Sequence, residues 1–366
     1  MLPPAFHPPQ NPTDEAAWLT WLDANRLAAA AAHMLDLTQL TPTARAHLQA
    51  ANAQARAQWL VRKMALQHML RLMACAPYAL ILLKGAALAL TIYGDPAIRP
   101  MNDIDILIGP EHLMPVVEQM RKAGFEEHGL AQGEDVGYLH HFIFTDPNTH
   151  VRFELHRTLP LLPSDEALNW FLAQTQTTTI EDAPCMTLTP EAQLLHLASH
   201  AVLEHGGARD ALAIWFYDID QLIRKTGDDI DWETVLLKAQ QLKWEAALQE
   251  AIRLAHKLFE TPIPAAWIDW LQLSQTRLSG YNTLQKMTSA HRSSSLTAFL
   301  ILRGLSWRQR GRQLAHMLFP SRSYMQRRYP HTPWLLAYPY RWLGAARKLL
   351  PAMLNANHKH QSPYDS

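Results

Sequence analysis

Hydrophobic positions divide the chain into a helical beginning, a central part with strand-like runs and a helical second half. Residues 14–76 are rich in Ala, Leu, Gln and Arg, and their apolar side chains recur at intervals of three and four, which predicts helix. Pro77 ends this section because proline interrupts a helix. After Pro190, apolar positions again follow helical spacing as far as Phe259.

Between the helical sections, short apolar runs alternate with turn residues. The expected elements are a strand at 78–83, a helix at 86–92, a strand at 103–108, a helix at 112–123 ending at Gly124, and a hairpin of strands at 141–144 and 150–156. We therefore predict an α+β fold. A small mixed β-sheet core with helices is flanked by N-terminal helices and by a mostly helical C-terminal half.

Prolines and shifts in composition indicate four sections along the chain. They are an N-terminal helical section (1–76), the core with the strands (77–185), a helical domain (186–300) and a basic, aromatic, proline-punctuated C-terminal segment (301–366).

The formal net charge of zero hides a division of charge. Before Trp270, 19 Lys and Arg face 32 Asp and Glu, whereas from Trp270 onward 14 Lys and Arg face the single acid Asp365. Three interpretations of this basic tail stay open: docking on the acidic body of the same chain, peripheral contact with an acidic membrane, and nucleic-acid binding, which we do not favour.

The sequence also indicates a compartment. Residues 1–15 lack the basic and apolar regions of a secretory signal, and no run reaches about 18 uninterrupted apolar residues. Cys75 and Cys185 form no CxxC pair, so two free thiols are expected. We expect a cytoplasmic protein.

Two carboxylates lie on the second predicted strand. Because side chains alternate along a strand, Asp103 and Asp105 share one face, opposite Ile104 and Ile106. Such close negative charges repel unless a cation lies between them, and Mg²⁺ (or Mn²⁺) prefers hard oxygen ligands and substrate phosphates. An isolated Asp-x-Asp is common, so its neighbours decide whether it carries chemistry.

Three neighbouring features supply what phosphoryl transfer requires. The turn of Lys84 and Gly85 can bring backbone N–H groups and a point charge to a phosphate, so both are candidate nucleotide-binding residues. Arg99 can clamp the phosphates or neutralise the departing pyrophosphate. Glu154, on a later strand, can complete the carboxylate cluster as a ligand or as the base for an attacking hydroxyl. The candidate catalytic residues and metal ligands are therefore Asp103, Asp105 and Glu154.

The chain carries a series of motifs in one order: the runs 82–108, 124–125, His141, 153–156, 194–206, 215–219 and 318–321. This set closely resembles the bacterial family described as uncharacterised nucleotidyltransferases, which is similar to the DNA polymerase beta-type nucleotidyltransferase superfamily. The resemblance spans roughly residues 60–330 and implies that the strand-containing core is a nucleotidyltransferase core.

The resemblance also implies a two-metal mechanism in which Asp103 and Asp105 hold Mg²⁺ and Glu154 completes the triad. An acceptor hydroxyl would attack the α-phosphate of an NTP such as ATP, and pyrophosphate would leave. The chain departs from the wider superfamily in two ways, because Gly85 lies farther from Asp103 than the usual glycine motif and Glu154 stands in place of an Asp.

Histidines in the second half suggest another kind of site. His196 and His200 are four positions apart on one helix face, and His205 and Asp218 follow, a spacing compatible with zinc. The segment lacks an HExxH glutamate and any Cys ligand, so we prefer a structural or substrate-lining role. The candidate substrate-lining residues are His156, His200 and Asp218.

Two further functions stay open. One is a non-catalytic nucleotide-binding or interaction protein with a basic tail. The other is a sugar-nucleotide glycosyltransferase that uses the Asp-x-Asp pair, although no nucleotide-sugar domain is evident. The acceptor, whether small molecule, sugar or protein, is not indicated by the sequence.

Overall fold

The computed structural model describes residues 4–9, 12–74, 78–128, 141–159, 161–181 and 183–288. In the C-terminal segment it describes residues 311, 318, 319, 322, 325, 329, 332, 333 and 336–343. Cys75 and most of the basic tail lie outside the described residues, so the interpretations of that tail stay predictions.

The chain forms two compact units. One comprises Met1–His128 and His140–Arg292, and the other comprises Gly129–Leu139 and Ser293–Ser366. In the second unit residues 336–343 are helical, and the indole Nε1 of Trp342 donates to the Leu318 carbonyl oxygen at 2.7 Å. The sheet and the predicted site residues belong to the first unit. The four predicted sections stay predictions.

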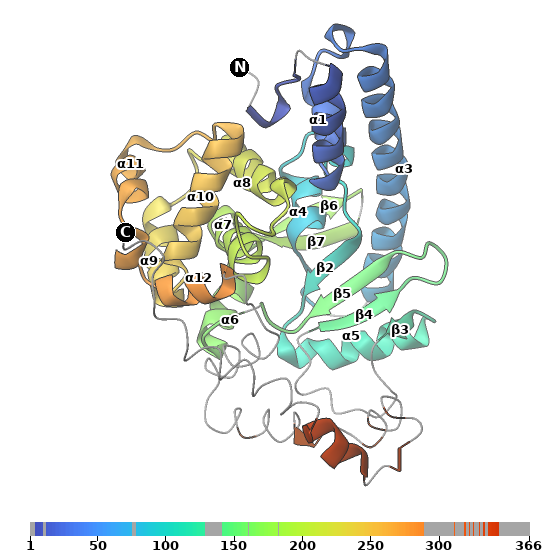
Figure 1. Cartoon of the computed structure of the whole chain (residues 1–366). Helices are drawn as coiled ribbons and strands as arrows, with labels where there is room; N and C mark the ends of the chain where they lie inside the picture. Colours follow the sequence, from blue (N-terminus) through green and yellow to red (C-terminus); the bar gives the residue numbers. More distant parts are fainter. Residues whose placement is uncertain are drawn as a thin grey trace. The chain divides into compact units, whose positions relative to one another are not determined.

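The N-terminal section is helical, as predicted, and one long helix dominates it. Its helices are α1 (Pro12–Ala24), α2 (Ala28–Met34) and α3 (Pro42–Met73), with 3-10 turns at Pro4–Phe6 and Leu37–Gln39. Two usual start signals begin α3: Thr41 Oγ1 accepts a hydrogen bond from the Ala44 amide, and Pro42 occupies the first turn. Figure 1 shows α3 running along one side of the sheet.

Seven strands form one mixed sheet, which confirms the predicted α+β fold. The strands are β1 (Ile81–Leu82), β2 (Asp103–Leu107), β3 (Glu126–His128), β4 (His141–Thr145), β5 (Arg152–His156), β6 (Thr175–Ile180) and β7 (Ala183–Leu188). Their order across the sheet is β3-β4-β5-β2-β1-β7-β6. β2 pairs with β5, and β1 with β7, in parallel, whereas the other neighbours are antiparallel.

The sequence predicts part of this sheet and misses part of it. The expected hairpin is confirmed by the antiparallel pairing of β4 with β5. The strand β3 and the β6–β7 hairpin are not predicted. Five of the six residues of β6 are polar, so this edge strand lacks the apolar alternation on which a prediction depends.

Alternation along β2 and β5 separates apolar from charged side chains. The apolar face carries Ile104 and Ile106 of β2 and Phe153 and Leu155 of β5, all buried. Below the sheet in Figure 1 lies α5 (Pro110–Lys122), which buries Leu113, Val116, Val117 and Met120. Gly124, with a φ of +82°, follows the end of α5, as predicted for its cap. The opposite face of β2 and β5 carries the carboxylates of Asp103, Asp105 and Glu154.

Two short elements precede β2, namely α4 (Lys84–Thr91) and a 3-10 turn at Pro96–Ile98.

The second half is mostly helical, as predicted. Its helices are α6 (Asp165–Ala173), α7 (Pro190–Ser199), α8 (Ala213–Thr226), α9 (Trp232–Leu242), α10 (Glu245–Phe259), α11 (Ala265–Gln272) and α12 (Tyr281–Thr288), with a 3-10 turn at Gln275–Arg277. A π-helical turn, His200–Glu204, continues α7. None of the described helices has the length and apolar character needed to cross a membrane.

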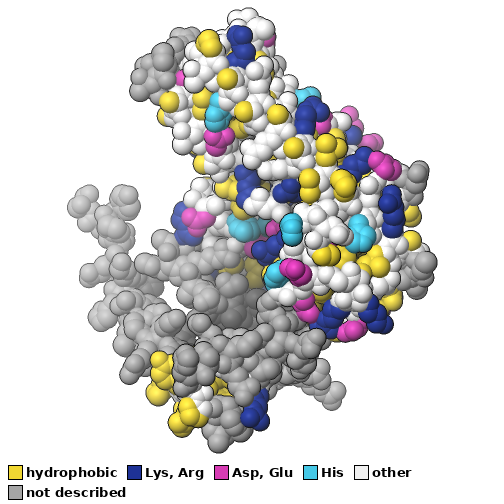
Figure 2. Space-filling model, turned by 90° about the vertical axis from the view of Figure 1, so that its right-hand side faces the viewer, with side chains coloured by type: hydrophobic (Ala, Val, Ile, Leu, Met, Phe, Trp, Pro, Cys, Tyr) yellow, Lys and Arg dark blue, Asp and Glu magenta, His cyan; other side chains and the backbone are white. Residues whose placement is uncertain are grey.

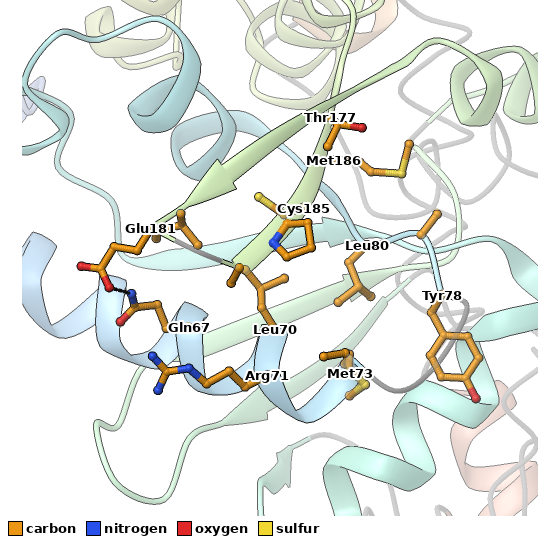
Figure 3. Close-up of a pocket in the computed structure, with 15 residues that line it drawn as sticks. Gln67, Leu70, Arg71, Met73, Tyr78, Leu80, Thr177, Glu181, Cys185 and Met186 are labelled. Atoms are coloured by element: carbon orange, nitrogen blue, oxygen red, sulfur yellow. Dashed lines mark hydrogen bonds between the residues drawn. The ribbon is translucent and has the colours of Figure 1, made fainter.

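A cavity of about 460 Å³ lies between the end of α3 and the β6–β7 hairpin (Figure 3). Leu70, Leu80 and Cys185 give it an apolar lining, and Gln67 hydrogen-bonds to Glu181 at its rim. Cys185 is a free thiol, as predicted. Burial raises the pKa of this thiol from its ordinary 9.0 to about 11.

Candidate active site

Parallel pairing of β2 with β5 places charged side chains next to one another. Asp105 lies opposite Glu154, and Asp103 lies opposite Arg152. Because adjacent strands are about 4.8 Å apart, side chains in register on one face are neighbours. Asp105, Glu154 and His156 each offer a ligand atom, and these atoms lie within 4.8 Å of one another. Two carboxylates and an imidazole thus converge at this point of the sheet.

Asp105 is the most buried of these carboxylates, with 6% of the residue exposed. Lys84 Nζ donates to its Oδ1 at 3.0 Å, and His156 Nε2 lies 2.7 Å from the same oxygen. Burial alone would raise the pKa of Asp105, but the charge of Lys84 and the hydrogen bond from His156 outweigh burial and hold the pKa well below its usual range. Asp105 is therefore ionised at neutral pH.

Asp103 is half-buried and lies outside the group formed by Asp105, Glu154 and His156. Burial raises the pKa of Asp103, and the negative charges of Asp105 and Glu154 raise it further. Lys84 and Arg152 oppose that rise. The two predicted aspartates therefore influence each other electrostatically, but it is Asp105, not Asp103, that groups with Glu154 and His156.

Glu154 is half-buried on the same face. Arg152, two positions earlier on β5, forms an ion pair with its carboxylate, and His156 Nε2 lies 3.8 Å from its Oε2. The predicted substrate-lining residue His156 thus contacts both carboxylates. One ligand atom each of Asp105, Glu154 and His156 lies within 4.8 Å of the others, close enough to share a cation.

Lys84 and Gly85 begin α4, where the backbone turns sharply. Lys84 has a φ of +48°, a conformation that side-chain-bearing residues seldom adopt. A Cβ atom added at Gly85 would lie 3.3 Å from Met101 Cβ and 3.6 Å from the Arg99 guanidinium. Glycine therefore lets the loop before β2 approach the start of α4. The predicted contact of Gly85 with a phosphate stays a prediction.

Arg99 and Asp218 form a buried pair instead of facing open space. Arg99 Nε and Nη2 donate to Asp218 Oδ1 and Oδ2 at 2.6 and 2.8 Å, and the Tyr93 hydroxyl donates to Oδ1 at 2.8 Å. Burial would lower the pKa of Arg99, but the charge of Asp218 raises it. The sequence predicts that Arg99 binds nucleotide and that Asp218 lines the substrate site. Such contacts would require the ion pair to separate, since Arg99 and Asp218 already hydrogen-bond to each other.

Two arginines that the sequence does not single out lie near Asp103. Burial lowers the pKa of both Arg26 and Arg62, whereas the charge of Asp103 raises it. Arg62 Nη1 donates to the Gln58 carbonyl oxygen, and its buried Nε has no hydrogen-bond partner among the described residues. Arg62 lies on α3 and Arg26 in the turn between α1 and α2. Both are far from Asp103 in sequence, so no local motif could have identified them.

A histidine cluster lies within electrostatic reach of the carboxylates. His200 Nδ1 lies 2.9 Å from Glu204 Oε2, and the imidazole of His196, with 1% of the residue exposed, leaves both nitrogens without a partner among the described residues. Burial lowers the pKa of His196, and the charge of Lys84 lowers it further. Figure 2 shows acidic, basic and histidine side chains next to one another near the middle of one face of the molecule.

Comparison with known proteins identifies a family for the chain. The family model described as uncharacterised nucleotidyltransferase matches residues 11–260, a range that begins and ends earlier than the expected 60–330 and leaves out the 318–321 motif. No curated protein matches the chain. Among solved structures, an antigenic nucleotidyltransferase-like protein from Paracoccidioides brasiliensis is 15% identical, with 51% of this chain and 92% of that chain covered and a TM-score of 0.32. Since the family model spans more than half of the chain, the protein belongs to the family of uncharacterised nucleotidyltransferases.

Proposed function

We infer that the protein is a metal-dependent nucleotidyltransferase, which moves an NMP from an NTP to a hydroxyl acceptor and releases pyrophosphate. Membership of the family supports nucleotidyl transfer in general. The observation that carries the finer proposal is the register of β2 and β5, in which Asp105 lies opposite Glu154. Asp103, two residues before Asp105 on β2, points to the same face of the sheet.

The residues present fit a divalent cation. Carboxylate oxygens suit Mg²⁺ or Mn²⁺, and Asp103, Asp105 and Glu154 would hold it, with the His156 imidazole beside them. Asp105 is the best prepared ligand because its pKa is held low and it is ionised at neutral pH. A bound ion would neutralise the phosphates and polarise the phosphorus that is attacked.

Positive side chains around the carboxylates would bind the triphosphate. Lys84 donates a hydrogen bond to Asp105. To the phosphate-binding residues we add Arg62 and Arg26, which lie within electrostatic reach of Asp103. Gly85 keeps its proposed place at the phosphates through its backbone N–H. Arg99, whose guanidinium would lie 3.6 Å from a Cβ at Gly85, would act on the nucleotide through Gly85 and is thus a positioning residue.

Glu154 would act at the acceptor. Its half-buried carboxylate is held by an ion pair with Arg152, and it would accept the hydroxyl proton or complete the ligand set. His156 would hold Asp105 in orientation through its 2.7 Å contact. The acceptor itself would approach on the side of the histidine cluster, where His200 keeps its proposed substrate-lining role.

Calorimetry followed by product analysis tests the proposal. Each NTP is titrated into the purified protein with and without Mg²⁺, and the nucleotide is then recovered after incubation with cell extract. We expect binding that requires Mg²⁺, and conversion of the NTP to pyrophosphate and a nucleotidylated product. Binding with intact NTP in every acceptor screen supports the non-catalytic alternative, and no binding of any NTP contradicts both.

A further inference from the structure

We propose that His200, Glu204 and His205 form a second metal site, for an ion of the class of Zn²⁺, on the π-helical turn after α7. This site goes beyond the proposed nucleotidyl transfer, whose metal would be held by the carboxylates on β2 and β5. The three residues offer ligand atoms that all lie within 4.8 Å of one another.

The π-helical turn explains why the three side chains converge. The His205 amide donates to the His200 carbonyl oxygen at 3.1 Å, a bond between residues five positions apart. In this wider turn the residues four and five positions after His200 lie on its side of the helix, whereas a regular α-helix turns the fifth residue away. Single π-helical turns occur frequently at functional sites.

The types of donor differ from those of the carboxylate site. Two imidazoles and one carboxylate form a common ligand set of protein-bound zinc, and a substrate or water takes the fourth position where three protein ligands are present. Mg²⁺ prefers oxygen ligands and keeps much of its water. The donor set on the π-helical turn therefore favours a transition metal over Mg²⁺.

Packing holds the two imidazoles in place. The Trp215 ring lies 4.9 Å from the His200 ring and 4.3 Å from the His205 ring, between centroids, and the two histidine rings are themselves 4.5 Å apart. Only 5% of His200 is exposed. Ligands whose rings are fixed by neighbours lose little freedom on binding a metal, so this arrangement is prepared for one.

His196 gives an independent reason to expect a ligand here. Its ring stacks on the His200 ring at 6.3 Å between centroids and 29° between planes, and both of its buried nitrogens lack a partner among the described residues. Burying a polar group without a hydrogen bond is unfavourable. A metal ion and its bound water beside His200 would give the His196 imidazole a partner and remove that cost.

Metal analysis of the full-length protein tests the proposal. The protein is equilibrated with Zn²⁺, freed of loose metal by gel filtration and measured by elemental analysis, and a Co²⁺ sample is examined for visible ligand-field bands. We expect about one bound Zn²⁺ per chain, and at least about tenfold weaker binding in His205→Ala and in Glu204→Gln, the second of which preserves the shape of the side chain. Circular dichroism checks that each variant is folded.

Two controls separate this site from the carboxylate site. His128→Ala removes a histidine exposed on the edge strand β3 and should leave Zn²⁺ binding unchanged. Glu154→Gln should also retain Zn²⁺, whatever its effect on nucleotide transfer. Zn²⁺ binding that is absent in the wild type, or that keeps its wild-type affinity in folded Glu204→Gln and His205→Ala, overturns the proposal.

Discussion

Arg99 donates two hydrogen bonds to the two carboxylate oxygens of Asp218, 119 positions later in the chain. Both residues are buried, and the pair joins the loop before β2 to α8 in the helical half. A bidentate pair of this kind fixes geometry as well as charge. The strand that carries Asp103 and Asp105 is therefore held in place by a helix from outside the sheet.

Removing one partner of this pair should be costly. Asp218→Ala leaves the Arg99 guanidinium buried without its counter-charge, so we expect the free energy of unfolding to fall by about 3–5 kcal/mol in urea denaturation. The double variant Arg99→Met with Asp218→Leu removes both charges and should lose less. A loss below about 1 kcal/mol in Asp218→Ala would contradict a structural role for the pair.

Two glycines with similar backbone angles should differ in their tolerance of a methyl group. Gly124 and Gly280 have φ values of +82° and +80°. A Cβ at Gly124 meets nothing within 4 Å, whereas one at Gly280 would lie 1.8 Å from the Lys243 carbonyl oxygen. Thermal unfolding should show a loss of about 1 kcal/mol for Gly124→Ala and a clearly larger loss for Gly280→Ala. Equal losses of stability in the two variants would contradict the predicted clash between a Cβ at Gly280 and the Lys243 carbonyl oxygen.

The Cys185 thiol should react slowly at neutral pH. With its pKa raised to about 11, the thiolate is scarce at pH 8, and burial limits access. Iodoacetamide labelling, quantified by mass spectrometry of the Cys185 peptide, should be slow in the folded protein and about 100-fold faster in urea at the same pH. Equally fast labelling in the folded state would rule out the buried thiol.

The same shift predicts how Cys185 affects stability. Because the folded-state pKa is above the unfolded value, its contribution is fully present below pH 9.0 and is lost as the pH rises towards about 11. The free energy of unfolding of the wild type should therefore fall more steeply over this interval than that of Cys185→Ala. The same pH dependence of the free energy of unfolding in the wild type and in Cys185→Ala would contradict the raised pKa of Cys185.

The ion pair between Lys84 and Asp105 should matter for nucleotide transfer more than for folding. Lys84→Gln removes the cation 3.0 Å from Asp105 Oδ1, so we expect transfer to fall by about 100-fold, the loss typical for a group that stabilises developing charge. Lys122→Gln, at the exposed end of α5, is the matched control and should be neutral. Equal rates in both variants would exclude Lys84 from the site.

Local pattern explains what the sequence could predict. The alternation in residues 103–107 predicts that Asp103 and Asp105 share a face, and the run 152–156 predicts the same for Glu154 and His156. Nothing local indicates that these two strands pair in parallel across nearly fifty positions. The approach of Arg62 to Asp103 and the burial of Arg99 against Asp218 likewise depend on tertiary packing, which short motifs do not encode.

Transfer of label from an α-labelled NTP tests the central proposal most directly. The wild type and Asp105→Asn, both checked for folding, are incubated with Mg²⁺, each NTP in turn and cell extract as the source of acceptor. We expect the wild type to attach label to an acceptor and release unlabelled pyrophosphate, and Asp105→Asn to lose at least about 100-fold of that rate. No incorporation by the wild type, or an unchanged rate in Asp105→Asn, would contradict a nucleotidyltransferase centred on Asp105.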